Sequence, residues 1–354
     1  MIIKPLKAKD VIKAIEFDRP SRVPMVSTHW WGEGLCDQYG DRLREFDKYP
    51  RDACIAYAGM PDFKPRDDGW WWKLPVRAID PNVNIGNESK IHLHDWDDLK
   101  ILEEHPPDVN TPGILDRALR ECKSGHENGK YVLLKHWGLM FEPLWNFRGM
   151  GNLFMDYYQN PKEIHRLHRL ITDTELAFLD RAIREVRPHG FFHSDDFGSQ
   201  ANLMISPEIF REFIAPYYKE IYDYLKRKGL HIWLHSCGNV TSIIGDLIDL
   251  GLNALHPIQK HTMNEVEVVA KWGGKIAFWS GMDVQHTLQT GTTEEVRAEV
   301  RFLMDTFDLP EGGMMIAAGN GIVSGTPFEN IDAYLDEACK YGLIHRRKFS
   351  QRRL

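Results

Sequence analysis

The chain has 354 residues, of which 43% are hydrophobic and 27% are charged, a composition typical of a globular enzyme. Its formal net charge of −7 argues against nucleic acid as the main partner, and no apolar run reaches the roughly 18 residues that span a bilayer. Five widely spaced cysteines without a CxxC pair, and an N-terminus without the apolar core of a signal peptide, indicate a cytoplasmic protein.

Short apolar runs alternate with helical stretches along the chain. Continuous apolar runs of this length are typical of strands buried on both faces, as in a parallel sheet. The predicted strands cover residues 23–29, 53–59, 131–137, 190–196, 231–236, 253–258, 275–281 and 313–319. Predicted helices cover residues 160–186, 206–229 with a break or kink at Pro216, 292–307 with a Thr292–Glu295 capping box, and 326–342.

Eight strands alternating with helices predict a single-domain (β/α)8 TIM barrel over residues 1–354. Residues 60–130 break the rhythm and are expected to form an insertion, or lid, over one mouth of the barrel. Residues 343–354 are expected to be a solvated basic tail. A doubly wound open sheet is the alternative, but no GxGxxG follows an early strand, so a dinucleotide-binding domain has no support.

In a barrel of this kind the active site lies at the C-terminal ends of the strands. Polar and aromatic side chains gather at these ends, and we expect them to converge on one cup. The candidate site residues are His29, Trp30, Trp31, His136, Glu142, His193, Asp195, Asp196, Gln200, His235, Cys237, Gln259, Asp283 and Asn320.

His235 and Cys237 are two residues apart where the fifth predicted strand ends. Residues i and i+2 of a strand point to one side, so both side chains can face the mouth of the barrel. An imidazole and a thiolate in this arrangement form half of a tetrahedral zinc site. The alternative is a hydrogen-bonded histidine beside a small packing residue, and the spacing alone leaves both interpretations open.

Four segments resemble the uroporphyrinogen decarboxylase superfamily, over residues 130–342. They are "HSDDFGSQANLMISPEIFREFIAPYYKEI", "WLHSCGNV…LIDLGLNALHPIQ", "FWSGMDVQHTLQTGTTEEVRAEV" and "AAGNGIVSGTPFENIDAYLDEA". The resemblance implies the (β/α)8 barrel and one of two reactions. These are decarboxylation of the acetate arms of a tetrapyrrole, and methyl transfer between a small methylated compound and a corrinoid protein.

The methyltransferase branch resembles this chain better than the decarboxylase does. In the decarboxylase an arginine-rich loop follows the first strand, whereas this chain has no arginine between Val23 and Arg42 and offers Trp30 and Trp31 instead. Zinc-bearing methyltransferases share the H-x-C of His235 and Cys237, followed by a G-C-G pattern. Here that pattern reads Gly319-Asn320-Gly321, with asparagine in place of the cysteine, so the sequence leaves open whether the protein binds zinc. Further ligands could come from Asp195, Asp196, His193 or Gln259.

The resulting prediction is a corrinoid-dependent methyltransferase. It would move a methyl group from a small donor, such as an aromatic methyl ether, to a cobalt(I) corrinoid on a separate protein. Asp195 or Asp196 would be the proton donor or substrate anchor, and His235 and Cys237 would bind metal or activate the methyl-bearing oxygen. The alternatives are an enzyme that decarboxylates a tetrapyrrole or other carboxylated substrate, and a non-catalytic barrel that binds a tetrapyrrole or corrinoid. The sequence leaves open whether the protein forms a homodimer.

Overall fold

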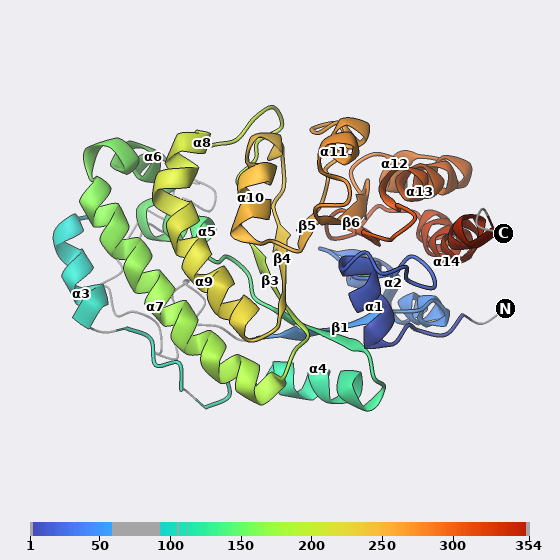
Figure 1. The fold of residues 1–354 in the computed structure, drawn as a ribbon, viewed down its shortest axis with the longest axis horizontal. Helices are drawn as coiled ribbons and strands as arrows, with labels where there is room; N and C mark the ends of the chain where they lie inside the picture. Colours follow the sequence, from blue (N-terminus) through green and yellow to red (C-terminus); the bar gives the residue numbers. More distant parts are fainter. Residues whose placement is uncertain (1–2, 59–92, 105, 111, 352–354) are drawn as a thin grey trace.

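The computed structural model describes residues 3–58, 93–104, 106–110 and 112–351 (Figure 1). Seven parallel strands form one sheet in the order in which they occur along the chain. Their bounds are β1 (Ala53–Tyr57), β2 (Tyr131–Lys135), β3 (Gly190–Ser194), β4 (His231–His235), β5 (Ala254–His256), β6 (Ala277–Met282) and β7 (Met314–Ala318). Each strand lies within, or within one residue of, a strand predicted from the apolar runs.

The remaining predicted strand, residues 23–29, lies between the two edges of this sheet as a single bridge. Met25 pairs in parallel with Ile316 of β7, and its carbonyl accepts a hydrogen bond from the amide of Asp52, just before β1. A longer strand does not form here because Pro24 has no amide donor and Ser27 adopts a φ of 57°. With this segment in the eighth position, the α/β barrel prediction is confirmed.

Helices connect the strands. The longer ones are α4 (Asp116–Glu127), α7 (Pro161–Val186), α9 (Ala215–Arg227), α13 (Thr293–Phe307) and α14 (Phe328–Gln351). The shorter ones are α1 (Ala8–Ile15), α2 (Leu35–Tyr39), α3 (Leu99–Glu104), α5 (Phe141–Arg148), α6 (Met150–Gln159), α8 (Pro207–Ile209), α10 (Ile244–Leu250), α11 (Glu265–Trp272) and α12 (Thr287–Thr290). There are also 3-10 helices η1 (Gly40–Lys48), η3 (Trp96–Asp98) and η5 (Thr241–Ile243), and the π-helical turn η4 (Phe210–Ile214).

Local sequence signals fix several of these boundaries. The predicted capping box is present at α13, where the Thr292 side chain accepts from the Glu295 amide and the Glu295 carboxylate accepts from the Thr292 amide. The predicted helix over 206–229 is interrupted by the π-helical turn η4, directly before Pro216 at the start of α9. Inside a helix, the proline ring would clash with the preceding turn and remove a hydrogen bond. Because Pro216 lies at the start of α9, no intrahelical hydrogen bond is lost there.

Successive side chains of a strand point to opposite faces of the sheet, so the core has one part inside the barrel and one part between the strands and the helices. One cluster lies inside the barrel and contains Val26, Tyr131, Leu133, Phe192, Trp233, Ala254, Ala277, Trp279, Met315 and Ala317. The buried side chains of α1 belong to the same cluster, so this helix closes the end at which the strands begin. The open mouth is therefore at the carboxyl ends of the strands, where the site was predicted.

The basic segment 343–354 differs from the predicted solvated tail. It continues α14 as far as Gln351, and the guanidinium of Arg346 is buried. That guanidinium donates to the Asp308 carboxylate and to the Leu309 carbonyl. These acceptors come from a distant part of the chain and hold the helix against the barrel.

The predicted insertion over 60–130 lies partly outside the described residues, which resume at Leu93 after Ala58. Within its described part, α4 packs against β1 and β2, in the place of a connecting helix of the barrel. A lid role for the rest stays a prediction.

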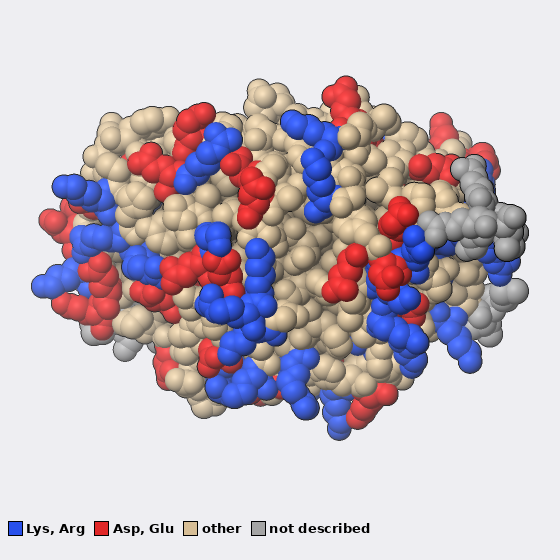
Figure 2. Space-filling view, in the orientation of Figure 1, with Lys and Arg blue, Asp and Glu red and all other residues tan. Residues whose placement is uncertain are grey.

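Two features bear on possible partners. No helix in the described ranges is long and apolar enough to cross a membrane. On the face shown in Figure 2, basic and acidic side chains are interspersed, as the modest net charge leads one to expect.

Candidate active site at the barrel mouth

Side chains at the ends of the strands separate onto two faces. The inward series along β2 is Tyr131, Leu133 and then Lys135, because successive side chains point to opposite sides. The same alternation turns His235 on β4 and His256 on β5 toward the interior. These three residues form the upper polar layer of the barrel, above the apolar cluster.

A chain of hydrogen bonds fixes the tautomer of His235. Nε2 of His256 donates to the carbonyl of Ala318, at 3.0 Å. Burial lowers the pKa of His256 to about 3, so its Nδ1 carries no proton and accepts from Nδ1 of His235, at 2.7 Å. Nε2 of His235 consequently carries no proton, and its lone pair can accept a hydrogen bond or bind a metal ion.

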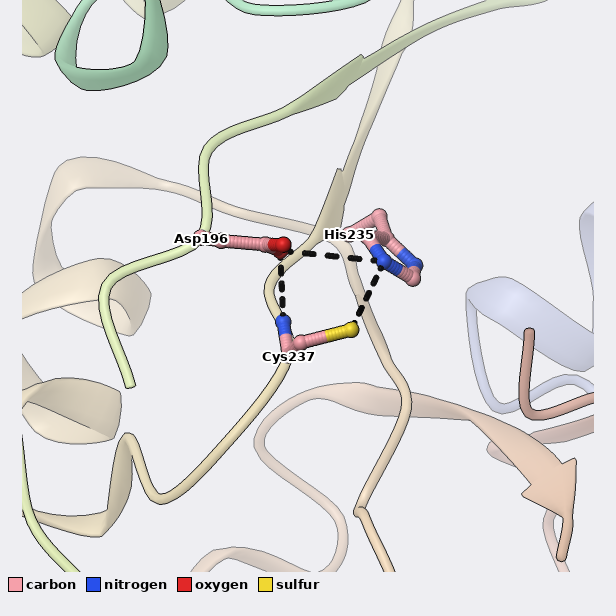
Figure 3. Close-up of side chains that lie close together, drawn as sticks. All are labelled: Asp196, His235 and Cys237. Carbon is pink, nitrogen blue, oxygen red and sulfur yellow. Dashed lines mark hydrogen bonds and ion pairs between the residues drawn. The ribbon is translucent and has the colours of Figure 1, made fainter. Parts of the chain in front are cut away.

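Cys237 and Asp196 meet this nitrogen (Figure 3). The Cys237 Sγ lies 3.2 Å from Nε2 of His235, and Oδ1 of Asp196 lies 3.7 Å from the same nitrogen. Oδ1 of Asp196 also accepts from the backbone amide of Cys237, at 2.7 Å. One nitrogen, one sulfur and one oxygen ligand atom all lie within 4.8 Å of one another.

The loop after β4 requires glycine to place Cys237. Gly238 has a φ of 79°, and a Cβ there would come within 2.3 Å of the Gly198 backbone. The loop after β3, which contains Gly198, therefore touches the loop after β4 backbone to backbone. The Gly198 amide donates to the Cys237 carbonyl. The Gly238 amide donates to Oε1 of Gln259, at 2.6 Å, which joins a third loop to the site.

Burial sets the protonation states of the cluster. It lowers the pKa of His235 well below its usual value, with further contributions from His256 and Lys135, so the imidazole is neutral. Burial, followed by the charge of Asp196, raises the pKa of the Cys237 thiol to about 12. In the absence of a cation the cluster therefore holds a neutral imidazole and a protonated thiol.

Glu142 supports Asp196 from α5. Both of its carboxylate oxygens accept from the Ser194 hydroxyl, at 2.8 and 2.9 Å, and one accepts from the Asp196 amide, at 3.1 Å. Burial, followed by the charges of Asp195 and Asp196, raises the pKa of Glu142 to about 8. The acidic groups near His235 thus repel one another, an arrangement that a bound cation would relieve.

The residues of this cluster fit a zinc ion. In tetrahedral geometry, Zn–N of about 2.0 Å and Zn–S of about 2.3 Å separate nitrogen and sulfur by roughly 3.5 Å. The observed separation of 3.2 Å between His235 and Cys237 is close to this value. The hydrogen bond to His256 fixes the orientation of the His235 ring and leaves Nε2 available. Histidines that bind metals are commonly oriented in this way, by a hydrogen bond from the ring nitrogen that does not bind the metal.

The cluster borders a cavity of about 760 Å³ at the barrel mouth. Six of the residues predicted from the strand ends line this cavity: Trp30, Gln200, Cys237, Gln259, Asp283 and Asn320. Nδ2 of Asn320 lies 3.7 Å from the Cys237 Sγ. The carboxylate of Asp283 accepts from the amides of Gln285 and Thr287, so it also begins α12.

Three predicted site residues point away from the interior of the barrel. Asp195 is fully buried, and its carboxylate accepts from the amides of Met140 and Glu142 at the start of α5. His193 contacts the Tyr222 hydroxyl, and His136 lies beside the Gly138 carbonyl. All three follow an inward-facing residue directly, so the alternation of the strand turns them away from the barrel interior.

His29 and Trp31 border a second cavity, of about 510 Å³, which Trp30 also lines. Nε2 of His29 contacts the Phe46 carbonyl, and Trp31 packs on the Phe46 ring. The predicted cup is thus two cavities with Trp30 between them.

Lys135 lines the second cavity and was not predicted. It ends the inward series that begins with Tyr131 and Leu133, and it is 5% exposed. A lysine at an inward position of an otherwise apolar strand was the signal in the sequence, because lysine is almost never buried without a partner.

Comparisons with known proteins agree with this architecture. A methyltransferase from Methanosarcina mazei superposes with a TM-score of 0.66 at 16% identity, over 94% of this chain and 98% of that one. At this identity the likeness shows a shared fold.

Curated relatives match part of the chain. The "Methylcobamide:CoM methyltransferase MtbA" of Methanosarcina mazei is 28% identical over 140 residues, and the "Methylcobamide:CoM methyltransferase MtaA" of Methanosarcina barkeri is 26% identical over 139 residues. Each match covers 39% of this chain and 38% of the relative. The sequence model described as uroporphyrinogen decarboxylase (URO-D) matches residues 146–341, more than half of the chain. The chain therefore belongs to the uroporphyrinogen decarboxylase family.

Proposed function

We propose that this protein transfers a methyl group from a small methylated donor to a cobalt(I) corrinoid carried on a separate protein. The partial similarity to curated methylcobamide:CoM methyltransferases supports methyl transfer and a corrinoid partner. An aromatic methyl ether is the donor that we favour, because the indole ring of Trp30 borders both cavities at the mouth.

One observation carries the proposal: the Nε2 lone pair of His235 faces the Cys237 sulfur and the Asp196 carboxylate at the edge of a large cavity. A methyl ether releases its methyl group only when the oxygen left behind is protonated or bound to a Lewis acid. Zinc held by these three residues would supply that Lewis acid. Without metal, Asp196 would supply the proton, since burial raises its pKa.

The other residues would bind and orient the donor. Gln259 already fixes the loop of Gly238, and its Nε2 faces Gln285 across the mouth. Asn320, which lies beside the Cys237 sulfur, offers an amide to the donor oxygen. A volume of about 760 Å³ holds a small donor together with the face of an approaching corrinoid.

Decarboxylation of a tetrapyrrole is the alternative that the family name suggests. A substrate rich in carboxylates requires several fixed guanidinium or ammonium groups. Among the described residues that line the larger cavity, Lys260 is the cationic one, and its Nζ already pairs with Glu299, at 2.9 Å. The lining therefore favours the methyltransferase.

The test is methyl transfer from a panel of methyl ethers and methylamines to reduced cobalamin, followed by the loss of cob(I)alamin absorbance. We expect turnover with at least one ether, a loss of about 100-fold or more in Asp196→Asn and Cys237→Ser, and no change in Cys36→Ser, an exposed cysteine. Carbon dioxide release from uroporphyrinogen without methyl transfer would establish the decarboxylase instead. No reaction with either substrate would favour the non-catalytic binding barrel.

A further inference from the structure

The side chain of Lys135 ends among four aromatic rings. Its Nζ lies 4.1 Å from the ring centre of Trp137, 4.6 Å from that of Trp30, 4.7 Å from that of Phe192 and 5.0 Å from that of Tyr57. Ring faces attract an ammonium group, but they accept no strong hydrogen bonds from it. Among the described residues, the amine has therefore lost water without gaining a conventional acceptor.

Within the described part of the chain, no residue forms a hydrogen bond or ion pair with Nζ of Lys135. Burial, followed by the charge of Arg117, lowers the pKa of Lys135 to about 7. A buried ammonium that lacks a counter-charge is stabilised by any anion that reaches it. A partner that the described residues do not supply is thus of a defined kind, and it has access through the cavity of about 510 Å³.

The charged groups around this cavity have a positive balance. Arg51 and Lys130 line it together with Lys135, and the acidic lining residue in the described ranges is Glu121. The Glu121 carboxylate is already engaged, because it pairs with Arg117 at 2.9 Å and accepts from the Tyr57 amide at 2.7 Å. Arg51 also has a partner, since it pairs with Asp47 at 2.7 Å, so an anion entering the cavity would meet the positive charge of Lys130 and Lys135.

Aromatic walls connect this cationic end to the cluster of Asp196, His235 and Cys237. The Trp30 and Trp137 rings lie 5.7 and 5.9 Å from the His235 ring, and both also contact Nζ of Lys135. A flat ligand lying along these indoles would reach the amine with one end and the cluster with the other. The arrangement suits an aromatic ring with an anionic group opposite the reacting substituent.

We propose that Lys135 binds the carboxylate of the methyl donor, and that the donor is a methoxylated aromatic carboxylic acid. The identity of the bound molecule as a methyl donor rests on the proposed function. The carboxylate site itself does not, because it depends only on the geometry around Lys135. Methoxybenzoate is the simplest probe of both statements.

The experiment is isothermal titration calorimetry of the full chain with 4-methoxybenzoate and with its neutral counterpart, 4-methoxybenzyl alcohol, in the absence of corrinoid. We expect the carboxylate to bind at least about tenfold more tightly, as a charge-assisted hydrogen bond would provide. Lys135→Met should lose this preference and keep the affinity for the alcohol, because methionine fills the aromatic cage. Lys123→Met, a change on the exposed face of α4, should behave as the wild type.

A second measurement uses the wild-type protein and so does not depend on how the variant folds. Acetylation of Lys135 by acetic anhydride, read by peptide mass spectrometry, should slow when 4-methoxybenzoate is bound and not when the alcohol is present. Equal binding of the two ligands, or an unchanged carboxylate preference in Lys135→Met, would overturn the proposal.

The two proposals can fail separately. A carboxylate preference that depends on Lys135, with no methyl transfer from any donor, would retain the binding site and reject the methyltransferase. Methyl transfer that proceeds equally well from 4-methoxybenzoate and the alcohol would retain the methyltransferase and reject the carboxylate site.

Discussion

Nδ1 of His235 and Nδ1 of His256 lie 2.7 Å apart, and this contact decides which nitrogen of His235 is available at the barrel mouth. Because His256 donates its own proton to the Ala318 carbonyl, His235 must donate through Nδ1. The Cys237 sulfur then faces an unprotonated Nε2. The interior of the barrel thus prepares a ligand atom before any metal or substrate arrives.

Replacing His256 tests this relationship. His256→Phe keeps a ring against Trp279 and Trp30 but removes the acceptor, so the His235 tautomer is no longer fixed. We expect zinc affinity to fall about 10–100-fold. Competition with a chromophoric chelator measures the affinity, and His126→Phe on α4 is the control. An unchanged affinity in His256→Phe would show that the tautomer is set elsewhere.

Proton release on metal binding tests the state of Cys237. Since burial raises the pKa of this thiol to about 12, it is protonated at pH 8 in the metal-free protein. A zinc ion must displace that proton to bind the thiolate, so about one proton should leave per zinc bound. Calorimetry in buffers of different ionisation enthalpy gives the number. Cys237→Ser should remove this release and Cys36→Ser should retain it; equal release in both variants would argue against a thiolate ligand.

Much of the fold could be predicted from local patterns. The runs that became β1 to β7 are short and continuously apolar, and the Thr292–Glu295 capping box marks the start of α13. The end of α14 could not be predicted, because Arg346 is held by acceptors such as Asp308 and the Pro20 carbonyl. Contacts so far apart along the chain leave no local signal.

The placement of the candidate site residues was predictable to within one residue of strand register. The sequence places Asp195 and Asp196 at the same strand end, but only coordinates show that Asp196 meets His235 while Asp195 anchors α5. A shift of one residue exchanges the two faces of a strand. The same uncertainty put His136 in the predicted cup and overlooked its neighbour Lys135.

A buried ion pair between Arg22 and Asp52 lies where residues 23–29 meet the start of β1. The Asp52 carboxylate accepts from the guanidinium at 2.6 and 2.7 Å and also from the amides of Leu6 and Met25. Asp52→Ala should lower the free energy of unfolding by about 3–5 kcal/mol, because it leaves the Arg22 charge buried without a partner. Urea denaturation measures the change.

The control for this prediction is a pair at the surface. Asp47 pairs with Arg51 at 2.7 Å, but both side chains are exposed, so Asp47→Ala should change the free energy of unfolding by less than about 0.5 kcal/mol. Similar losses in the two variants would mean that burial of the Arg22–Asp52 pair contributes nothing to the free energy of unfolding.

Asn320 is the point at which this chain departs most clearly from a thiol-rich zinc site, and its amide lies 3.7 Å from the Cys237 sulfur. A cysteine at this position would present a second thiolate to the same metal, and zinc favours sulfur over an amide. We expect Asn320→Cys to raise zinc affinity at least about tenfold, equivalent to ~1.4 kcal/mol, and Asn202→Cys in an exposed loop to leave it unchanged. Cobalt(II) substitution under reducing conditions provides the second readout, because a further thiolate strengthens the sulfur-to-cobalt absorption. If Asn320→Cys changes neither the affinity nor the spectrum, the metal does not lie between Cys237 and residue 320, and the cluster of Asp196, His235 and Cys237 would have to act through its protons alone.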